Sequence, residues 1–222
     1  MKNWLKKETH EIHNYESQRF IIGLTAFLLP LLVTLIYGRI ISSISAYYFT
    51  ISRNIFVGLL SVTGFFLFFY NGRYYYEALI SKLAALCAVG TALSPTGFPS
   101  DITKNADCLK ATIKEAEILH YIFSITLFAM LIFLCLCFAR RARIKTDKYS
   151  NQRRTIYLIC SGIMTVSLLT YPIGWLILPF SQEQLNQIHL LFFCESAALI
   201  SFGTAWFTAG KPLQHWKIFR NN

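Results

Sequence analysis

Six long apolar runs divide this 222-residue chain, and within each run the apolar residues are continuous rather than alternating with polar ones. The runs are Phe20–Tyr37, Ile55–Tyr70, about Glu77–Leu93, Ile118–Phe138, Ile156–Leu178 and Ile188–Ala209. A helix that crosses a bilayer needs roughly 17–25 such residues. Lipid admits only helices or closed barrels, because every backbone N–H and C=O must find a partner within the protein. Continuous runs favour helices, so the pattern predicts an all-α, polytopic membrane protein with a bundle of six transmembrane helices.

The basic residues are distributed unevenly between the two sides that six spans define. One side, formed by the two tails, the loops after the second and fourth runs and the nearby Lys82, carries 16 of the 21 Lys and Arg residues, and the other carries 5. Leaving out the third run, which Lys82 interrupts, reduces the split to 12 and 9. Basic residues concentrate on the cytoplasmic side of membrane proteins. We therefore predict an N-in/C-in membrane protein, with a cytoplasmic tail 1–19, one transmembrane domain 20–209 and a cytoplasmic tail 210–222.

The composition agrees with a membrane protein and excludes several functional classes. Charged residues make up 14% of the chain, whereas soluble domains carry about 25%. The basic residues follow the membrane boundaries rather than a folded reading face, so we expect no nucleic-acid partner. No C-x-x-C, H-E-x-x-H, G-x-S-x-G or phosphate-loop pattern occurs. We expect membrane lipids as partners and neither a cofactor nor a metal, while a homo-oligomer is left open.

Glu195 is the sharpest polar signal inside an apolar run. It lies seven residues after the start of the sixth run, which places it about 10 Å below the outer boundary of the helix. A charged carboxylate at the centre of a membrane helix costs about 2.5–3.5 kcal/mol. Glu195 should therefore be neutral, paired or facing a wet cavity. We predict either a ligand or proton site, or a carboxyl group that joins helices through hydrogen bonds.

Other polar residues gather at the outer ends of the same helices. His120 begins the fourth run, His189 begins the sixth, and Arg53 stands just before the second. The stretch SISAYYFTISRNIFVG (43–58) forms the outer loop around Arg53 and is more polar than a simple turn requires. Two interpretations are open. These residues form either a polar pocket at the helix ends or an interfacial belt, where Tyr, His and Arg lie at headgroup level.

The pocket is the interpretation that predicts a function. We expect this pocket to face outward and to bind a lipid headgroup or another small molecule. In this interpretation Arg53 meets an anionic group, while His120 and Glu195 supply hydrogen-bond donors or acceptors. Tyr47 and Tyr48 form the walls of its mouth. The predicted ligand-binding residues are Ser45, Tyr47, Tyr48, Arg53, His120, His189 and Glu195.

Two further functions are left open. An intramembrane lipid hydrolase or transferase would use His120 as the base and Glu195 as its partner or as a metal ligand, with Ser45 as the nearest nucleophile. Two histidines and a carboxylate also suit zinc, but His189 and Glu195 are six residues apart and roughly 120° apart around an ideal helix. A small proton-coupled carrier is the other candidate. Because no catalytic motif is present, the sequence leans against an enzyme.

Small residues recur at every fourth position in two of the runs. This spacing lets helix backbones approach closely in lipid. The residues are Ala84, Ala88 and Ala92 in the third run, and Ala197, Ser201, Ala205 and Ala209 in the sixth. We expect both stripes to lie in helix–helix contacts.

Two stretches, 43–60 and 195–211, carry a resemblance to a known group of proteins. SISAYYFTISRNIFVGLL and ESAALISFGTAWFTAGK resemble uncharacterised bacterial six-helix integral membrane proteins, with the patterns SIS-x-YY-x-T, R-D-x-FVG, L-H at helix four, and E-x-x-A-L-x-x-F-G-x-x-W-x-x-x-G. The matching residues are Ser43, Ser45, Tyr47, Tyr48, Thr50, Arg53, His120, Glu195, Phe202, Gly203, Trp206 and Gly210. Phe49 and Asn54 depart from the pattern, which has His or Tyr and Asp there. The resemblance implies a six-helix fold in a bacterial inner membrane without an assigned activity. The layout has a fainter similarity to DRAM/Sfk-type membrane proteins, which are linked to lipid handling, and we base no function on it.

Overall fold

The computed structural model describes residues 2–97, 114–144, 149–176 and 181–210. Within these ranges every regular element is helical, which confirms the predicted all-α class. The elements are α1 (Lys2–Tyr37), the 3-10 helix η1 (Ser45–Phe49), α2 (Arg53–Phe69), α3 (Tyr75–Leu93), α5 (Lys114–Ile144), α6 (Ser150–Leu176), α7 (Gln182–Gln187) and α8 (Leu190–Gly210).

Five of the described helices are long and apolar enough to cross a membrane. They are the candidate spans Glu16–Tyr37, Tyr75–Leu93, Lys114–Ile144, Ser150–Gly174 and Leu190–Gly210. The third apolar run, which Lys82 interrupts, is among them as α3. The second run forms α2, which is apolar but has 17 residues. The chain is therefore a helical membrane protein, and the full count of six spans stays a prediction.

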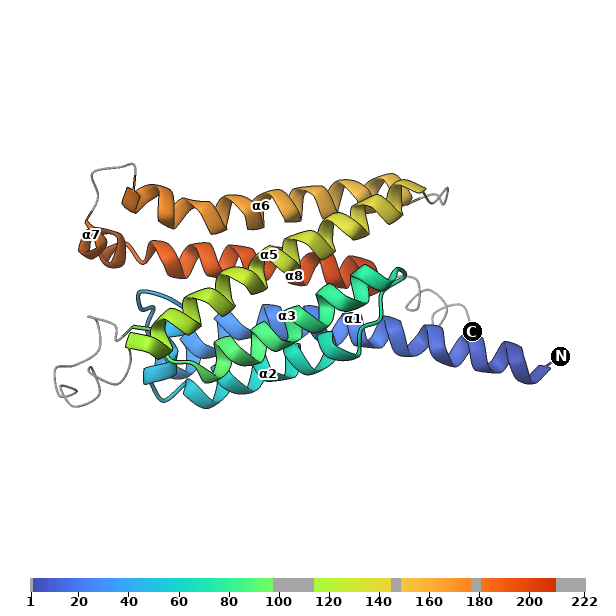
Figure 1. Cartoon of the computed structure of the whole chain (residues 1–222), viewed down its shortest axis with the longest axis horizontal. Coiled ribbons are helices and arrows are strands. Elements are labelled where there is room, and N and C mark those ends of the chain that lie inside the picture. The colour runs from blue at the N-terminus through green and yellow to red at the C-terminus, as the bar shows by residue number, and fades with distance from the viewer. Residues whose placement is uncertain (1, 98–113, 145–148, 177–180, 211–222) are drawn as a thin grey trace.

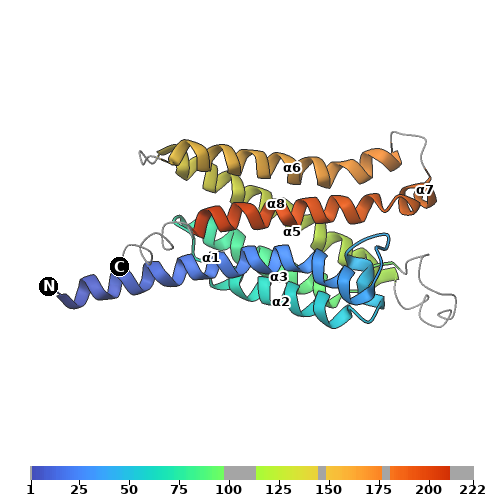
Figure 2. The same ribbon diagram turned by 180° about the vertical axis from the view of Figure 1, so that it is seen from behind.

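Helices α1, α2, α3, α5, α6 and α8 form a closed ring. Each packs against the next in this order, and α8 returns to α1. Figures 1 and 2 show these helices running along the long dimension of the molecule, with α5 crossing obliquely. One end of the bundle holds η1 and α7, and we call it the η1 end. The opposite end holds Arg19, Glu77 and Arg141, and we call it the arginine end.

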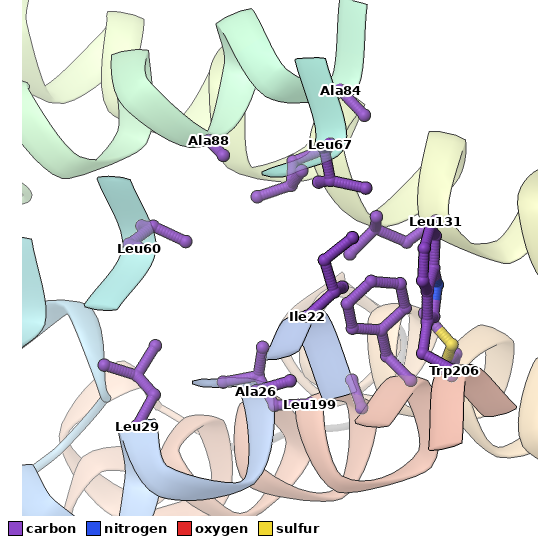
Figure 3. Close-up of a cluster of buried hydrophobic side chains, with 14 of the residues drawn as sticks. Ile22, Ala26, Leu29, Leu60, Leu67, Ala84, Ala88, Leu131, Leu199 and Trp206 are labelled. Atoms are coloured by element: carbon purple, nitrogen blue, oxygen red, sulfur yellow. The ribbon is translucent and has the colours of Figure 1, made fainter. Parts of the chain in front are cut away.

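Aromatic side chains fill the middle of the ring. Trp206 is fully buried, and its ring lies edge-on to Tyr70 at a centroid distance of 4.9 Å and to Phe138 at 5.2 Å. Figure 3 shows Trp206 beside Leu131, with Ile22 of α1 across the core. Between helices in lipid, such packing contributes more than apolar burial does, because the lipid tails are themselves apolar.

Small residues bring neighbouring helices together, as the sequence predicts. The stripe on α3 is fully buried at Ala84, Ala88 and Ala92. On α8, Gly203 lies directly against α1. A Cβ atom at position 203 would come within 2.9 Å of the Gly23 carbonyl oxygen and 2.7 Å of the Phe27 ring. Only glycine therefore allows this approach of α8 to α1.

Gly203→Ala is expected to lower the free energy of unfolding by about 1–3 kcal/mol, because the added methyl group must push α1 away. Gly162→Ala on α6 is the matched control, since no atom lies within 4 Å of a Cβ atom there. Both variants gain the helix propensity of alanine, so their difference isolates the contact. Thermal unfolding in detergent measures it, and equal midpoints for the two variants would rule out the close approach.

A buried ion pair joins α3 to α5 at the arginine end. Glu77 is 1% exposed, and its Oε2 atom lies 3.0 Å from Nη1 of Arg141. The same oxygen accepts the backbone N–H of Arg73 at 2.8 Å. The Tyr70 hydroxyl oxygen accepts hydrogen bonds from Nη2 of Arg141 at 3.2 Å and from Nη2 of Arg19 at 3.4 Å. This network links α1, α3 and α5 through residues that lie far apart in the sequence.

Candidate functional site

A cavity of about 450 Å³ lies at the η1 end between α5, α6 and α8, beside the segment that leads into η1. We call it the α5–α8 cavity. Apolar side chains form much of its wall. The polar side chains with the most chemistry to offer are Ser45, Glu117, His120, Tyr121, Ser124 and Glu195. Three of the residues predicted from the sequence, Ser45, His120 and Glu195, therefore meet at one space.

Glu195 lines the cavity and fastens α8 to the segment before η1. Its Oε2 atom accepts the backbone N–H of Ile44 at 2.5 Å, and Oε1 accepts the Ser45 hydroxyl at 3.5 Å. The N–H of Phe192 donates to the Ser42 carbonyl at 3.1 Å. Backbone and hydroxyl donors of the polar loop thus satisfy a carboxylate that apolar surroundings alone would leave unpaired. This contact gives a role to Ser45, one of the polar residues in the loop between α1 and α2.

His120 is held at the start of α5 with a defined pattern of ring protons. Its side chain is 2% exposed, and Nδ1 lies 2.8 Å from the carbonyl oxygen of Ser94, the C-cap residue that follows Leu93 of α3. A carbonyl oxygen can only accept a hydrogen bond, so Nδ1 carries a proton. In the neutral ring Nε2 is then an acceptor. The contact with α3 therefore fixes both the position and the tautomer of His120.

Glu117, Tyr121 and Ser124 belong to the same face of α5 as His120. Glu117 and Ser124 each lie three or four positions from both His120 and Tyr121, the spacing at which helix side chains lie side by side, and all four line the cavity. The Tyr121 hydroxyl donates to Oε1 of Glu117 at 3.2 Å. Glu117, Tyr121 and Ser124 were not predicted from the sequence, although Glu117 and Ser124 lie one helical turn before and after His120.

Arg53 and Tyr48 bind each other outside the cavity. Nη2 of Arg53 donates to the Tyr48 hydroxyl at 2.7 Å, and the guanidinium carbon lies 4.3 Å from the centre of the Tyr48 ring. Arg53 is exposed, and neither residue is part of the cavity lining. The structure thus places this pair apart from Glu195 and His120.

Tyr47 and His189 also lie away from the cavity lining. Tyr47 is fully buried in the core, where its hydroxyl donates to the Arg39 carbonyl at 2.8 Å. Burial raises the pKa of the Tyr47 phenol. His189 lies between α7 and α8 with a φ angle of 51°, and its buried Nδ1 has no hydrogen-bond partner in the described part of the chain. These two residues support the loop and the helix junction rather than line the cavity.

The chemistry of the cavity follows from its own side chains. Among the described residues, no group of three or more His, Cys, Asp or Glu is placed to hold a metal ion. Comparison of the chain with protein-family models, with curated proteins and with solved structures finds no match. The resemblance to bacterial six-helix proteins stays a prediction.

Hydrogen-bond acceptors in the cavity lining come from Glu117, His120 and Glu195. Glu195 and Glu117 present carboxylate oxygens, and the neutral His120 ring presents one nitrogen lone pair. The hydroxyl of Ser45 donates to Glu195, whereas His120 is bonded to the Ser94 carbonyl. Within the described chain no hydrogen bond therefore joins a serine nucleophile to His120, the contact that an acyl-transfer site requires.

Proposed function

We propose that this chain is a six-helix protein of the cell inner membrane that binds a lipid headgroup or another small molecule in the α5–α8 cavity. The observation that carries the proposal is the meeting of Ser45, His120 and Glu195, from three separate elements, around a space of about 450 Å³. Carboxylates inside a membrane are costly and typically mark functional sites. Cavities of a few hundred Å³ with a few converging polar groups are typical of small-molecule sites.

The basic residues support an orientation in which the η1 end faces outward. Arg141 and Arg143 lie in the last turn of α5, and Arg153 and Arg154 lie near the start of α6, all toward the arginine end. Such residues favour the cytoplasmic side. The 17 residues of α2 rise about 25 Å, close to the ~30 Å of a hydrocarbon core, so α2 supplies the sixth span. Both tails are then cytoplasmic and the cavity opens in the outer half of the membrane.

The walls of the cavity suit a lipid whose tails lie beside its headgroup. The apolar wall includes Ile125 and Phe128 of α5 and Leu168 and Leu176 of α6. In Figures 1 and 2, α5 and α6 lie together at the arginine end and diverge toward the η1 end, where the cavity is found. On the outer surface of α6, Val166 is 66% exposed, as expected of a side chain that faces lipid. A headgroup in the cavity would leave its acyl chains next to these apolar helices.

Ser167→Trp is expected to reduce the amount of bound ligand at least about tenfold, because an indole of some 150–250 Å² occupies the space between α5 and α6. Val166→Trp is the matched control, since the neighbouring side chain points away from the cavity and is 66% exposed. Mass spectrometry of the lipids and small molecules that co-purify with each variant measures the amount. Equal amounts with both tryptophans would argue that the ligand lies elsewhere.

A further inference from the structure

We infer that the molecule bound in the α5–α8 cavity carries a protonated amine. This inference rests on the proposed function and narrows it to one ligand chemistry. The charged side chains of the lining are Glu117 and Glu195, and no Lys or Arg of the described chain belongs to it. The whole protein has a formal net charge of +10. An acidic cavity in so basic a protein is a specific feature of this site.

Glu195 is the first group of the cavity that favours a ligand with a positive charge. Its oxygens accept hydrogen bonds from the Ile44 N–H and the Ser45 hydroxyl. Neither donor carries a charge, and in the described chain no basic side chain pairs with this carboxylate. A carboxylate away from water is stabilised most by a charge-assisted hydrogen bond to a cation. A ligand ammonium group at this position would supply the missing charge.

The other polar atoms around the cavity favour the same ligand. His120 is 2% exposed, and its Nδ1–H donates to the Ser94 carbonyl, so Nε2 of the neutral ring is the atom that can accept a hydrogen bond. Glu117 accepts the hydroxyl of Tyr121 at 3.2 Å and keeps further lone pairs. An ammonium group has three donors and no acceptor. It therefore complements this set of acceptors in both charge and hydrogen bonding.

Aromatic rings of the lining add to the preference for a cation. Tyr121, Phe128 and Tyr171 belong to the cavity wall, and ring faces attract ammonium groups. An anionic group, by contrast, would meet two carboxylates. Arg53, the cation that the sequence predicts to meet an anionic group, lies outside the lining and stacks on Tyr48. The cavity is thus built for a cationic group.

The amine has two sources, the headgroup of a membrane lipid or a free small amine, and the test separates them. Delipidated wild-type protein is titrated in detergent with phosphatidylethanolamine and with its N-acetyl derivative of identical acyl chains, and native mass spectrometry measures occupancy. Parallel titrations use free ethanolamine and N-acetylethanolamine. Acetylation removes the positive charge and leaves one N–H donor, so each amine is expected to bind at least about tenfold more tightly than its acetylated form.

Two variants show whether that preference arises in the cavity. Glu195→Gln should bring the affinities for the amine and for its acetylated form close to each other. Glu183 is an exposed residue of α7 outside the lining, so Glu183→Gln should keep the preference for the amine. If the amine lipid binds more tightly than its acetylated form, the inference is supported and the ligand is a lipid. If only the free amine shows this preference, the inference is supported and the ligand is a small soluble amine. Equal binding of the two lipids, abolished by Ser167→Trp, would overturn the amine and leave the cavity a lipid site. If no probe binds the folded wild type, both the amine and the proposed function fail.

Discussion

Arg141→Met is expected to lower the free energy of unfolding by about 3–5 kcal/mol, the effect of removing one partner of a buried ion pair. The substitution leaves Glu77, which is 1% exposed, without the guanidinium that lies 3.0 Å from its carboxylate. It also removes the donor that Arg141 directs at the Tyr70 hydroxyl. Reversible unfolding in mixed detergent micelles, followed by circular dichroism, measures the change.

Two companion variants separate the ion pair from the mere loss of an arginine. Arg140→Met removes an exposed neighbour on the same turn of α5 and is expected to cost less than about 1 kcal/mol. The double variant Glu77→Met with Arg141→Met is expected to recover most of the loss, because two apolar side chains replace two charges. The interpretation of Glu77 and Arg141 as a structural pair is wrong if Arg141→Met and Arg140→Met unfold alike.

Glu195→Gln is expected to weaken the binding of phosphatidylethanolamine at least about tenfold, or about 1.4 kcal/mol, because the amide lacks the charge that balances the ligand ammonium. The fold should persist, since the amide oxygen can still accept the N–H of Ile44. A bound ligand stabilises the native state in proportion to the logarithm of its concentration over Kd. The shift in Tm that saturating lipid produces should therefore be smaller in Glu195→Gln than in the wild type.

The same titration contains its own check on folding. Without lipid, the Tm of Glu195→Gln should lie close to that of the wild type, because the amide oxygen can accept the Ile44 N–H and the amide NH2 can donate to the Ser45 hydroxyl oxygen. A large loss of Tm in the absence of lipid, together with an unchanged increment on adding lipid, would assign Glu195 to helix packing alone. This outcome would favour the hydrogen-bonding carboxyl that the sequence also allowed.

The helices were predictable because lipid leaves an apolar run few conformations other than a helix. The run Ile118–Phe138, for example, lies inside α5 (Lys114–Ile144). The ends were less predictable, because helices continue past the apolar region into polar residues. Helix α1 shows the largest difference, since it begins at Lys2 whereas its apolar run begins at Phe20.

Part of the site was predictable for the same physical reason. Ionisable residues such as Glu195 and His120 are costly inside apolar helices, so their presence indicates a special environment. The neighbour toward which each side chain points was not predictable, because it depends on the order of the helices around the ring. Arg53 shares the η1 end with Glu195 but stacks on Tyr48, a partner five residues away in its own loop.

The ion pair at the arginine end could not be predicted from the sequence alone. Glu77 and Arg141 are 64 residues apart, and they meet because α3 and α5 are neighbours in the ring. Nothing in the local pattern around either residue indicates that neighbour. The stripe of Glu117, His120 and Tyr121 is different, because its helical spacing is visible in the sequence itself.

The claim that the α5–α8 cavity is a ligand site is tested most directly by native mass spectrometry of the detergent-solubilised protein. Wild type, Glu195→Gln and the control Glu183→Gln are compared under identical conditions. We predict a defined bound mass, belonging to an amine-bearing molecule, in the wild type and in Glu183→Gln, and its loss from Glu195→Gln. An empty wild type would contradict the claim, and the same mass retained in all three proteins would remove Glu195 from the ligand site.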